Sequence, residues 1–135
     1  MLNRPYTRVL DQLRGAGLRP TRQRMALAKL LFDNGDRHIT AEMLHNEAMS
    51  AQIRVSLATV YNTLHQFTDA GLLREIVVDA SRSYFDTNTG EHHHFFVERT
   101  GELMDIPHGE LTVSNLPTPP GGMKIDSVNV VIRVK

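Results

Sequence analysis

The stretch that decides the fold is Ser56–Gly71, with the sequence SLATVYNTLHQFTDAG. Its large apolar residues recur at steps of three and four positions, which is typical of one face of an α-helix: Leu57, Val60, Leu64 and Phe67. Ser56 is of the type that caps a helix N-terminus, and Gly71 is suited to end the helix. The other faces, including Thr63, are polar but almost uncharged, which suits either base reading or ordinary helix packing.

Shorter helices are expected before this one. The first covers residues 5–14, the second begins after Thr21 and runs to about Asp33, and the third begins after Thr40. The apolar side of the third helix is expected to be Met43, Leu44, Ala48 and Met49.

Two strands joined by a turn are expected after the helices. Leu72 to Val78 and Arg82 to Asp86 are the strands, and Asp79-Ala80-Ser81 is the turn. Helices followed by such a hairpin indicate a winged helix, in which the third and fourth helices form a helix-turn-helix and the fourth enters the major groove.

Charge is distributed unevenly along the chain, although the formal net charge is zero. Residues 1–83 hold 11 Lys and Arg against 8 Asp and Glu, whereas residues 84–135 hold 4 against 7. A basic N-terminal half is typical of polyanion binding, and a solvated helix face is the alternative.

With no cysteine, the chain has neither a disulfide nor a thiolate metal site. It lacks a membrane-spanning apolar stretch, so we expect a cytoplasmic protein.

Three consecutive histidines occur in Glu91–Val97, with the sequence EHHHFFV. On a strand, His92 and His94 would point to the same face, about 6.6 Å apart along the chain, and His93 to the other. This spacing favours a metal or haem site, and a solvated His-rich turn is the alternative.

The C-terminal half is expected to be α+β, which makes the whole chain α+β. Three strands and one short helix are expected: His92–Val97, Glu102–Ile106, Ile125–Val134, and a helix over Gly109–Asn115. We expect a winged-helix domain at 1–86, a polar hinge at 87–90, and a dimerisation and metal-sensing domain at 91–135. So small a sheet is not expected to be stable alone, which favours a homodimer with paired sheets.

The chain resembles the ferric uptake regulator (Fur) family over nearly its whole length. The matching segments are AGLRPTRQR at 16–24, HITAE at 38–42, SLATVYNTL at 56–64, AGL at 70–72 and HHH at 92–94. The triple histidine and the ending VNVVIRV at 128–134 are most similar to the iron response regulator (Irr) branch. The resemblance implies a dimeric, metal-responsive repressor that binds a palindromic AT-rich operator and controls iron or haem homeostasis genes.

The resemblance also implies a regulatory metal site, with these ligands: His38, Asp86, His92, His94 and Asp105. Such a mixed nitrogen and oxygen set suits Fe(II) or Mn(II), and Zn would also fit. Peroxide sensing through histidine oxidation is an alternative, because the peroxide-sensing branch also has an aspartate at the position of Asp105.

A second metal site or a haem site is a further alternative, with a looser set of candidates: Glu91, His93, His108 and Glu110. A haem-sensing regulator would use the cluster His92–His94. The structural zinc that many relatives hold with four cysteines is not expected, because Val97 and Thr100 occupy the first pair's places.

For DNA, the resemblance implies a base contact from Tyr61 with Asn62 beside it, Thr59 on the same helix, and Arg19 in the minor groove. Many relatives have arginine at the position of Asn62. Two other classes of protein are alternatives: a small His/Asp metal hydrolase and a metal-buffer module that does not read DNA. We expect no enzyme, because no general base stands beside the histidine cluster.

Overall fold

The computed structural model describes residues 4–135, with side chains from residue 6 onward. The chain forms two compact units, Met1–Thr89 and Gly90–Lys135. Within residues 4–135, none of the helices has the length and apolar character needed to cross a bilayer.

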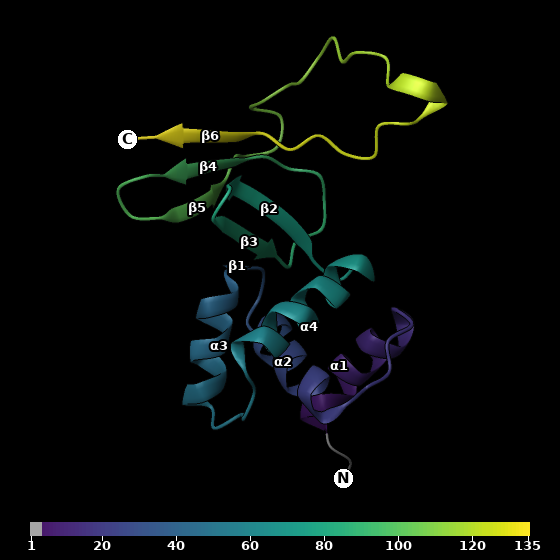
Figure 1. The fold of residues 1–135 in the computed structure, drawn as a ribbon, viewed down its shortest axis with the longest axis vertical. Helices are drawn as coiled ribbons and strands as arrows, with labels where there is room; N and C mark the ends of the chain where they lie inside the picture. The colour runs from purple at the N-terminus through teal and green to yellow at the C-terminus, as the bar shows by residue number, and fades with distance from the viewer. Residues whose placement is uncertain (1–3) are drawn as a thin grey trace. The chain divides into compact units, whose positions relative to one another are not determined.

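From Arg4 onward, the first unit contains four α-helices (Figure 1): α1 Arg4–Gly15, α2 Arg22–Phe32, α3 Ala41–Ser50 and α4 Leu57–Asp69. The predicted N-caps are confirmed. The side chains of Thr21, Thr40 and Ser56 each accept a hydrogen bond from the backbone N–H three residues later, at 3.1 to 3.2 Å. These caps satisfy backbone donors that have no partner inside the helix.

The core of this unit comes from all four helices and the wing, and includes Val9, Leu13, Leu27, Leu31, Leu44, Val60, Leu64, Phe67 and Phe85. Two expectations from the periodicity are wrong. Leu57, Met43 and Met49 are 36%, 43% and 61% exposed, whereas Thr63 is buried. The buried stripe of α4 runs through Val60, Thr63, Leu64 and Phe67, and burial of Thr63 is tolerated because its hydroxyl donates to the Thr59 carbonyl at 2.8 Å.

A three-stranded sheet completes the first unit, in the order β1-β3-β2. Its strands are β1 His38–Ile39, β2 Arg74–Asp79 and β3 Arg82–Asp86. The antiparallel pair β2 and β3 is the predicted wing. β1 is only two residues long, and it pairs antiparallel with β3, so that His38 lies opposite Asp86.

The second unit is built on another three-stranded sheet, in the order β5-β4-β6. Its strands are β4 His94–Val97, β5 Glu102–Asp105 and β6 Val131–Val134. β4 pairs antiparallel with β5 and parallel with β6. Phe96, Leu103 and Ile106 are buried here. The predicted α+β class, a winged helix followed by a small second unit, is confirmed.

The segment between β5 and β6 departs from the expectation. The predicted helix over Gly109–Asn115 is absent, and the only regular element in 107–130 is a 3-10 turn, η1 Pro120–Gly122. The two end residues of that segment, Gly109 and Asn115, have positive φ angles of 87° and 58°, and residues 111–119 between β5 and η1 have no regular structure. The predicted strand at 125–134 is shortened to β6, because β4 offers only four residues for pairing.

Candidate metal centre and DNA-reading surface

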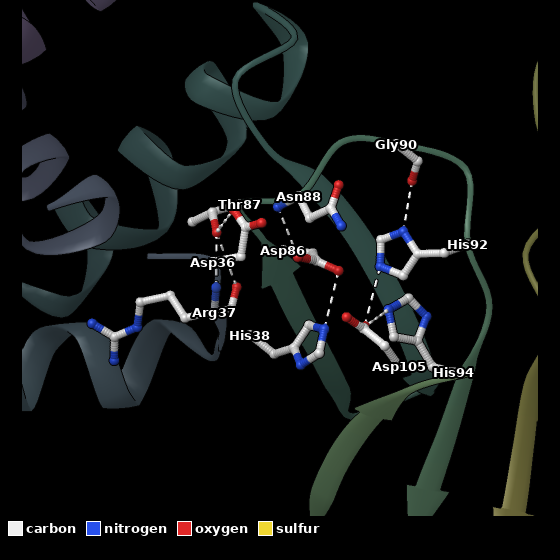
Figure 2. A network of polar contacts seen from close by, with 10 residues as sticks. All are labelled: Asp36, Arg37, His38, Asp86, Thr87, Asn88, Gly90, His92, His94 and Asp105. Atoms are coloured by element: carbon white, nitrogen blue, oxygen red, sulfur yellow. Dashed lines mark hydrogen bonds and ion pairs between the residues drawn. The ribbon is translucent and has the colours of Figure 1, made fainter. Parts of the chain in front are cut away.

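The first unit contributes one histidine and one carboxylate from neighbouring strands. His38 on β1 and Asp86 on β3 are direct cross-strand partners, and side chains at such positions lie close together. The Nε2 atom of His38 is 3.1 Å from Oδ2 of Asp86 (Figure 2). Asp86 is only 1% exposed, so its carboxylate is held at a fixed position.

Backbone groups orient this carboxylate from the other side. The N–H of Asn88 donates to Oδ1 of Asp86 at 2.9 Å. The following turn is tied to the loop before β1, because Thr87 N–H donates to the Arg37 carbonyl at 3.1 Å and Arg37 N–H donates to the Thr87 hydroxyl at 2.8 Å. Arg37 in turn donates to Glu47 of α3 at 2.9 Å. Sequence reasoning missed these supporting residues, because they are 10 to 50 positions apart.

The second unit contributes two histidines and one carboxylate. Asp105 on β5 lies directly opposite His94 on β4. The Nε2 atoms of His92 and His94 lie 3.2 and 3.3 Å from the same oxygen, Oδ1 of Asp105 (Figure 2). His94 is buried and His92 partly so, and their ring centroids are 4.5 Å apart. The expectation that these two histidines share a face is therefore confirmed, although β4 begins only at His94.

The hydrogen bond at Nδ1 of His92 indicates whether its other ring nitrogen, Nε2, can act as a metal ligand. Nδ1 of His92 lies 2.7 Å from the Gly90 carbonyl, which can only accept, so Nδ1 carries the proton. In the neutral ring Nε2 then offers a lone pair, and it faces a carboxylate oxygen that is also an acceptor. Two acceptors at 3.2 Å suit a shared cation, and fixing the tautomer through the remote nitrogen is the usual support for a metal-binding histidine.

The spacing of these groups also fits a metal. Two ligands about 2.1 Å from one ion and at right angles to each other lie about 3 Å apart. Imidazole with carboxylate suits Fe, Mn or Zn rather than Ca or Mg, which prefer oxygen alone. Each unit thus carries its own set of ligand groups: one His–Asp pair in the first, and two histidines with one aspartate in the second. We call these sets the two half-sites.

Three of the other sequence candidates line a cavity that His92 of the second half-site also lines. Glu91, His93 and His108 line a cavity of 540 Å³ in the second unit, and Glu110 does not line it. His93 points differently from its neighbours, since its Nδ1 accepts the N–H of Val130 at 3.1 Å. This bond joins the start of β4 to the approach to β6, so His93 has at least a structural role.

The predicted DNA-reading residues lie on α4 and on the turn before α2. Tyr61 is 37% exposed, Asn62 is exposed, and Thr59 is half-buried, with its hydroxyl accepting from Ser56 at 2.9 Å. Arg19 is exposed, and its carbonyl accepts from the Arg24 guanidinium at 2.8 Å.

Three further residues on this surface were not predicted from the sequence: Arg24, Gln66 and Glu42. Arg24 also donates to the side chain of Gln66 on α4 at 3.0 Å, so it ties the turn that carries Arg19 to the helix. Glu42 on α3 accepts the hydroxyl proton of Tyr61 at 2.6 Å. This hydrogen bond lowers the pKa of Glu42 and raises the pKa of Tyr61. No local sequence pattern reveals the contact, because the two residues are 19 positions apart.

Known proteins resemble this chain over most of its length. The model of the ferric uptake regulator family matches residues 15–133. The peroxide-responsive repressor PerR of Staphylococcus epidermidis is 35% identical over 102 residues, which cover 76% of this chain and 67% of that protein.

Solved structures agree in fold. The ferric uptake regulator of Pseudomonas aeruginosa, determined with manganese, has a TM-score of 0.69 and 27% identity, with 93% of this chain and 96% of that chain covered. The Vibrio cholerae ferric uptake regulator has a TM-score of 0.71 at 23% identity, covering 93% and 98%. Members of this family are transcription regulators rather than enzymes; they bind metals and DNA, and they act as dimers. The chain belongs to the ferric uptake regulator family.

Proposed function

We propose that this protein is a dimeric transcription regulator whose affinity for DNA depends on a divalent cation, Fe(II) or Mn(II), held by five residues: His38, Asp86, His92, His94 and Asp105. The observation that carries the proposal is the pair of half-sites. In each, strand register brings a histidine directly opposite an aspartate, at 3.1 Å for His38 and Asp86 and at 3.3 Å for His94 and Asp105.

The chemistry of the donors supports this choice of metal. The first half-site offers two ligand groups and the second offers three. Two imidazoles with one carboxylate already suit Fe(II) and leave coordination positions open, and the first half-site offers one more imidazole and one more carboxylate of the same kind. A relative at 27% identity was solved with manganese, which supports the same kind of ion here. When bound, the cation supplies positive charge that satisfies the carboxylates and the imidazole lone pairs together.

Regulation follows if both half-sites contribute to the same cation. Ligands from two units then restrict how the first unit turns relative to the second. In a dimer, that restriction limits the distance between the two α4 helices, and this distance must match the spacing of the two DNA half-sites. Affinity changes because the cation binds one arrangement better than the others. We expect the operator to be palindromic and AT-rich, and the protein to act in the cytoplasm as a repressor.

The test measures DNA binding as a function of metal. An operator is first selected from random duplexes with the full chain and Mn(II), and its affinity is then measured by fluorescence anisotropy before and after chelation. We expect chelation to weaken operator binding, and His94→Ala to remove the metal dependence. His108→Ala removes a histidine of the same unit outside the five ligands, and it should behave as wild type. Equal affinity with and without every divalent metal tested refutes the proposal.

Peroxide sensing is a second candidate, favoured by the 35% identity to a peroxide-responsive repressor. Hydrogen peroxide would transfer one oxygen atom to a histidine carbon beside bound iron and leave as water. Peptide mass analysis after peroxide treatment tests this. Addition of one oxygen to one of the three ligand histidines with Fe(II), but not with Mn(II), supports the candidate, and an unmodified protein that keeps its operator affinity excludes it.

The narrower resemblance to the Irr branch predicts a haem response. Here the structure adds one constraint: Nδ1 of His93 accepts a backbone hydrogen bond, so His93 would offer a haem iron its Nε2 atom. Haem titration of the wild type and of a His93→Ala variant tests this prediction by the position of the Soret band. A wild-type spectrum identical to that of free haem excludes it.

A further inference from the structure

The hydroxyl of Tyr61 has a fixed partner within the protein. Its proton is directed at Oε1 of Glu42 at 2.6 Å, a charge-assisted bond between α4 and the first turn of α3. Glu42 is itself stabilised as the anion, since the hydrogen bonds from Tyr61 and from its own backbone lower its pKa. The hydroxyl proton of Tyr61 is therefore held by a carboxylate before any ligand arrives.

The ring of Tyr61 is oriented as well. It stacks on the imidazole of His65 one turn further along α4, with centroids 6.4 Å apart and planes 21° from parallel. The His65 ring in turn packs edge-to-face with the ring of buried Phe85, with ring centroids 5.6 Å apart and ring planes 78° from parallel. The side chain is thus supported along its ring by His65 and at its hydroxyl by Glu42, although 37% of the residue remains exposed.

This arrangement determines what the hydroxyl can recognise. A phenol has one proton to donate and lone pairs that accept. With the proton directed at Glu42, the oxygen presents only lone pairs to a ligand. Phosphate oxygens, guanine O6 and N7, and thymine O4 are all acceptors and would face it unfavourably. In the major groove, the groups that donate are the exocyclic amines of adenine and cytosine.

We propose that Glu42 is a positioning residue that makes Tyr61 an acceptor-only reader, so that Tyr61 selects a base with an exocyclic amino group and rejects phosphate contact. This inference rests on the proposed DNA-binding function. Glu42 does not touch the base in this scheme. It acts through the hydroxyl of Tyr61, and its negative charge beside the helix adds to the rejection of misplaced phosphates.

The experiment uses the full chain with Mn(II) and an operator selected from random duplexes. Each adenine is replaced in turn by purine, which lacks the amino group, or by 7-deazaadenine, which keeps it but lacks N7; each cytosine is replaced by an analogue without its amino group. A residue that reads adenine through both N6 and N7, as an asparagine such as Asn62 can, is sensitive to both adenine replacements. An acceptor-only tyrosine is sensitive to the loss of the amine alone.

We expect one base position in each half of the DNA operator at which loss of the amine weakens wild-type binding about 2- to 12-fold, which is the range for one hydrogen bond. If that base is adenine, its replacement by 7-deazaadenine should have no effect on binding. Tyr61→Phe should remove this sensitivity. Glu42→Ala should reduce it, because the released hydroxyl can then donate as well as accept and so no longer rejects a base that offers only an acceptor. The double variant should behave like Tyr61→Phe. Asp69→Asn removes a carboxylate at the end of α4, so it controls for the general effect of charge on DNA affinity. Absorbance titration provides a DNA-free readout, since the raised pKa of Tyr61 should return toward 10.0 in Glu42→Ala.

The outcomes separate the two proposals. Selection that yields no operator in any metal state overturns the proposed function and this inference with it. An operator with no position sensitive to the amine alone, or one whose sensitivity is unchanged in Glu42→Ala, overturns the inference and leaves the proposed function intact.

Discussion

Replacing Asp86 by asparagine removes one carboxylate from the first half-site with little change of shape. The Oδ1 atom of the new side chain can still accept the N–H of Asn88, as Asp86 does at 2.9 Å. The lost group is the charged oxygen 3.1 Å from Nε2 of His38. Because the variant keeps the hydrogen bond that orients the buried side chain, we expect the metal-free protein to fold.

The expected effect on metal binding can be worked out from linkage. A cation present at 100 times its Kd stabilises the folded wild type by about 2.7 kcal/mol. If losing this ligand weakens binding about 100-fold, the same concentration equals the variant's Kd, and the stabilisation falls to about 0.4 kcal/mol. For a unit of this size, 1 kcal/mol corresponds to about 4–8 °C in Tm. The Mn(II)-induced rise in Tm should therefore fall from more than about 10 °C to about 2–3 °C.

Differential scanning calorimetry of the full chain across a series of Mn(II) concentrations measures this difference. Asp69→Asn is the matched control, because it makes the same change at an exposed position of the first unit outside both half-sites. Asp86→Asn with the full wild-type rise in Tm at every metal concentration would falsify the assignment of Asp86 as a ligand. A variant that is already unfolded without metal would instead show that its buried carboxylate is structural.

Three other changes give separate checks. Phe67→Ala removes a fully buried side chain that packs beside another core phenylalanine, so urea denaturation should show that the free energy of unfolding falls by about 3–5 kcal/mol. A decrease under about 1 kcal/mol contradicts the assignment of Phe67 to the core. Arg24→Ala removes the hydrogen bonds that tie the turn carrying Arg19 to α4, so it should weaken operator binding severalfold with little change in Tm. Unchanged operator affinity in fluorescence anisotropy argues against a role of Arg24 in positioning Arg19. The guanidinium of Arg82 holds the pKa of Asp79 well below its usual value, so the wing turn is stabilised above about pH 4 and loses this contribution as the pH falls further. NMR titration should show the Asp79 pKa rising in Arg82→Ala, and an unchanged pKa contradicts this cause.

Much of the fold was predictable from local signals. The helix caps at Thr21, Thr40 and Ser56 were recognisable because capping depends on residues only three positions apart. The wing hairpin followed from two apolar runs around a short polar turn. The helix expected over Gly109–Asn115 is absent because so short a helix needs an apolar face packed on a core, whereas residues 112–115 are exposed.

The sequence alone determined which residues are chemically able to act here: clustered histidines, a basic N-terminal half without cysteine, and a polar helix carrying Tyr61. Tertiary structure decided which of them meet. Strand register places His38 opposite Asp86 and His94 opposite Asp105, although the members of the first pair are 48 positions apart in the chain. Helix packing brings Glu42 to Tyr61 in the same way. Side chains interact according to distance in space, and the pairing of strands and packing of helices set that distance.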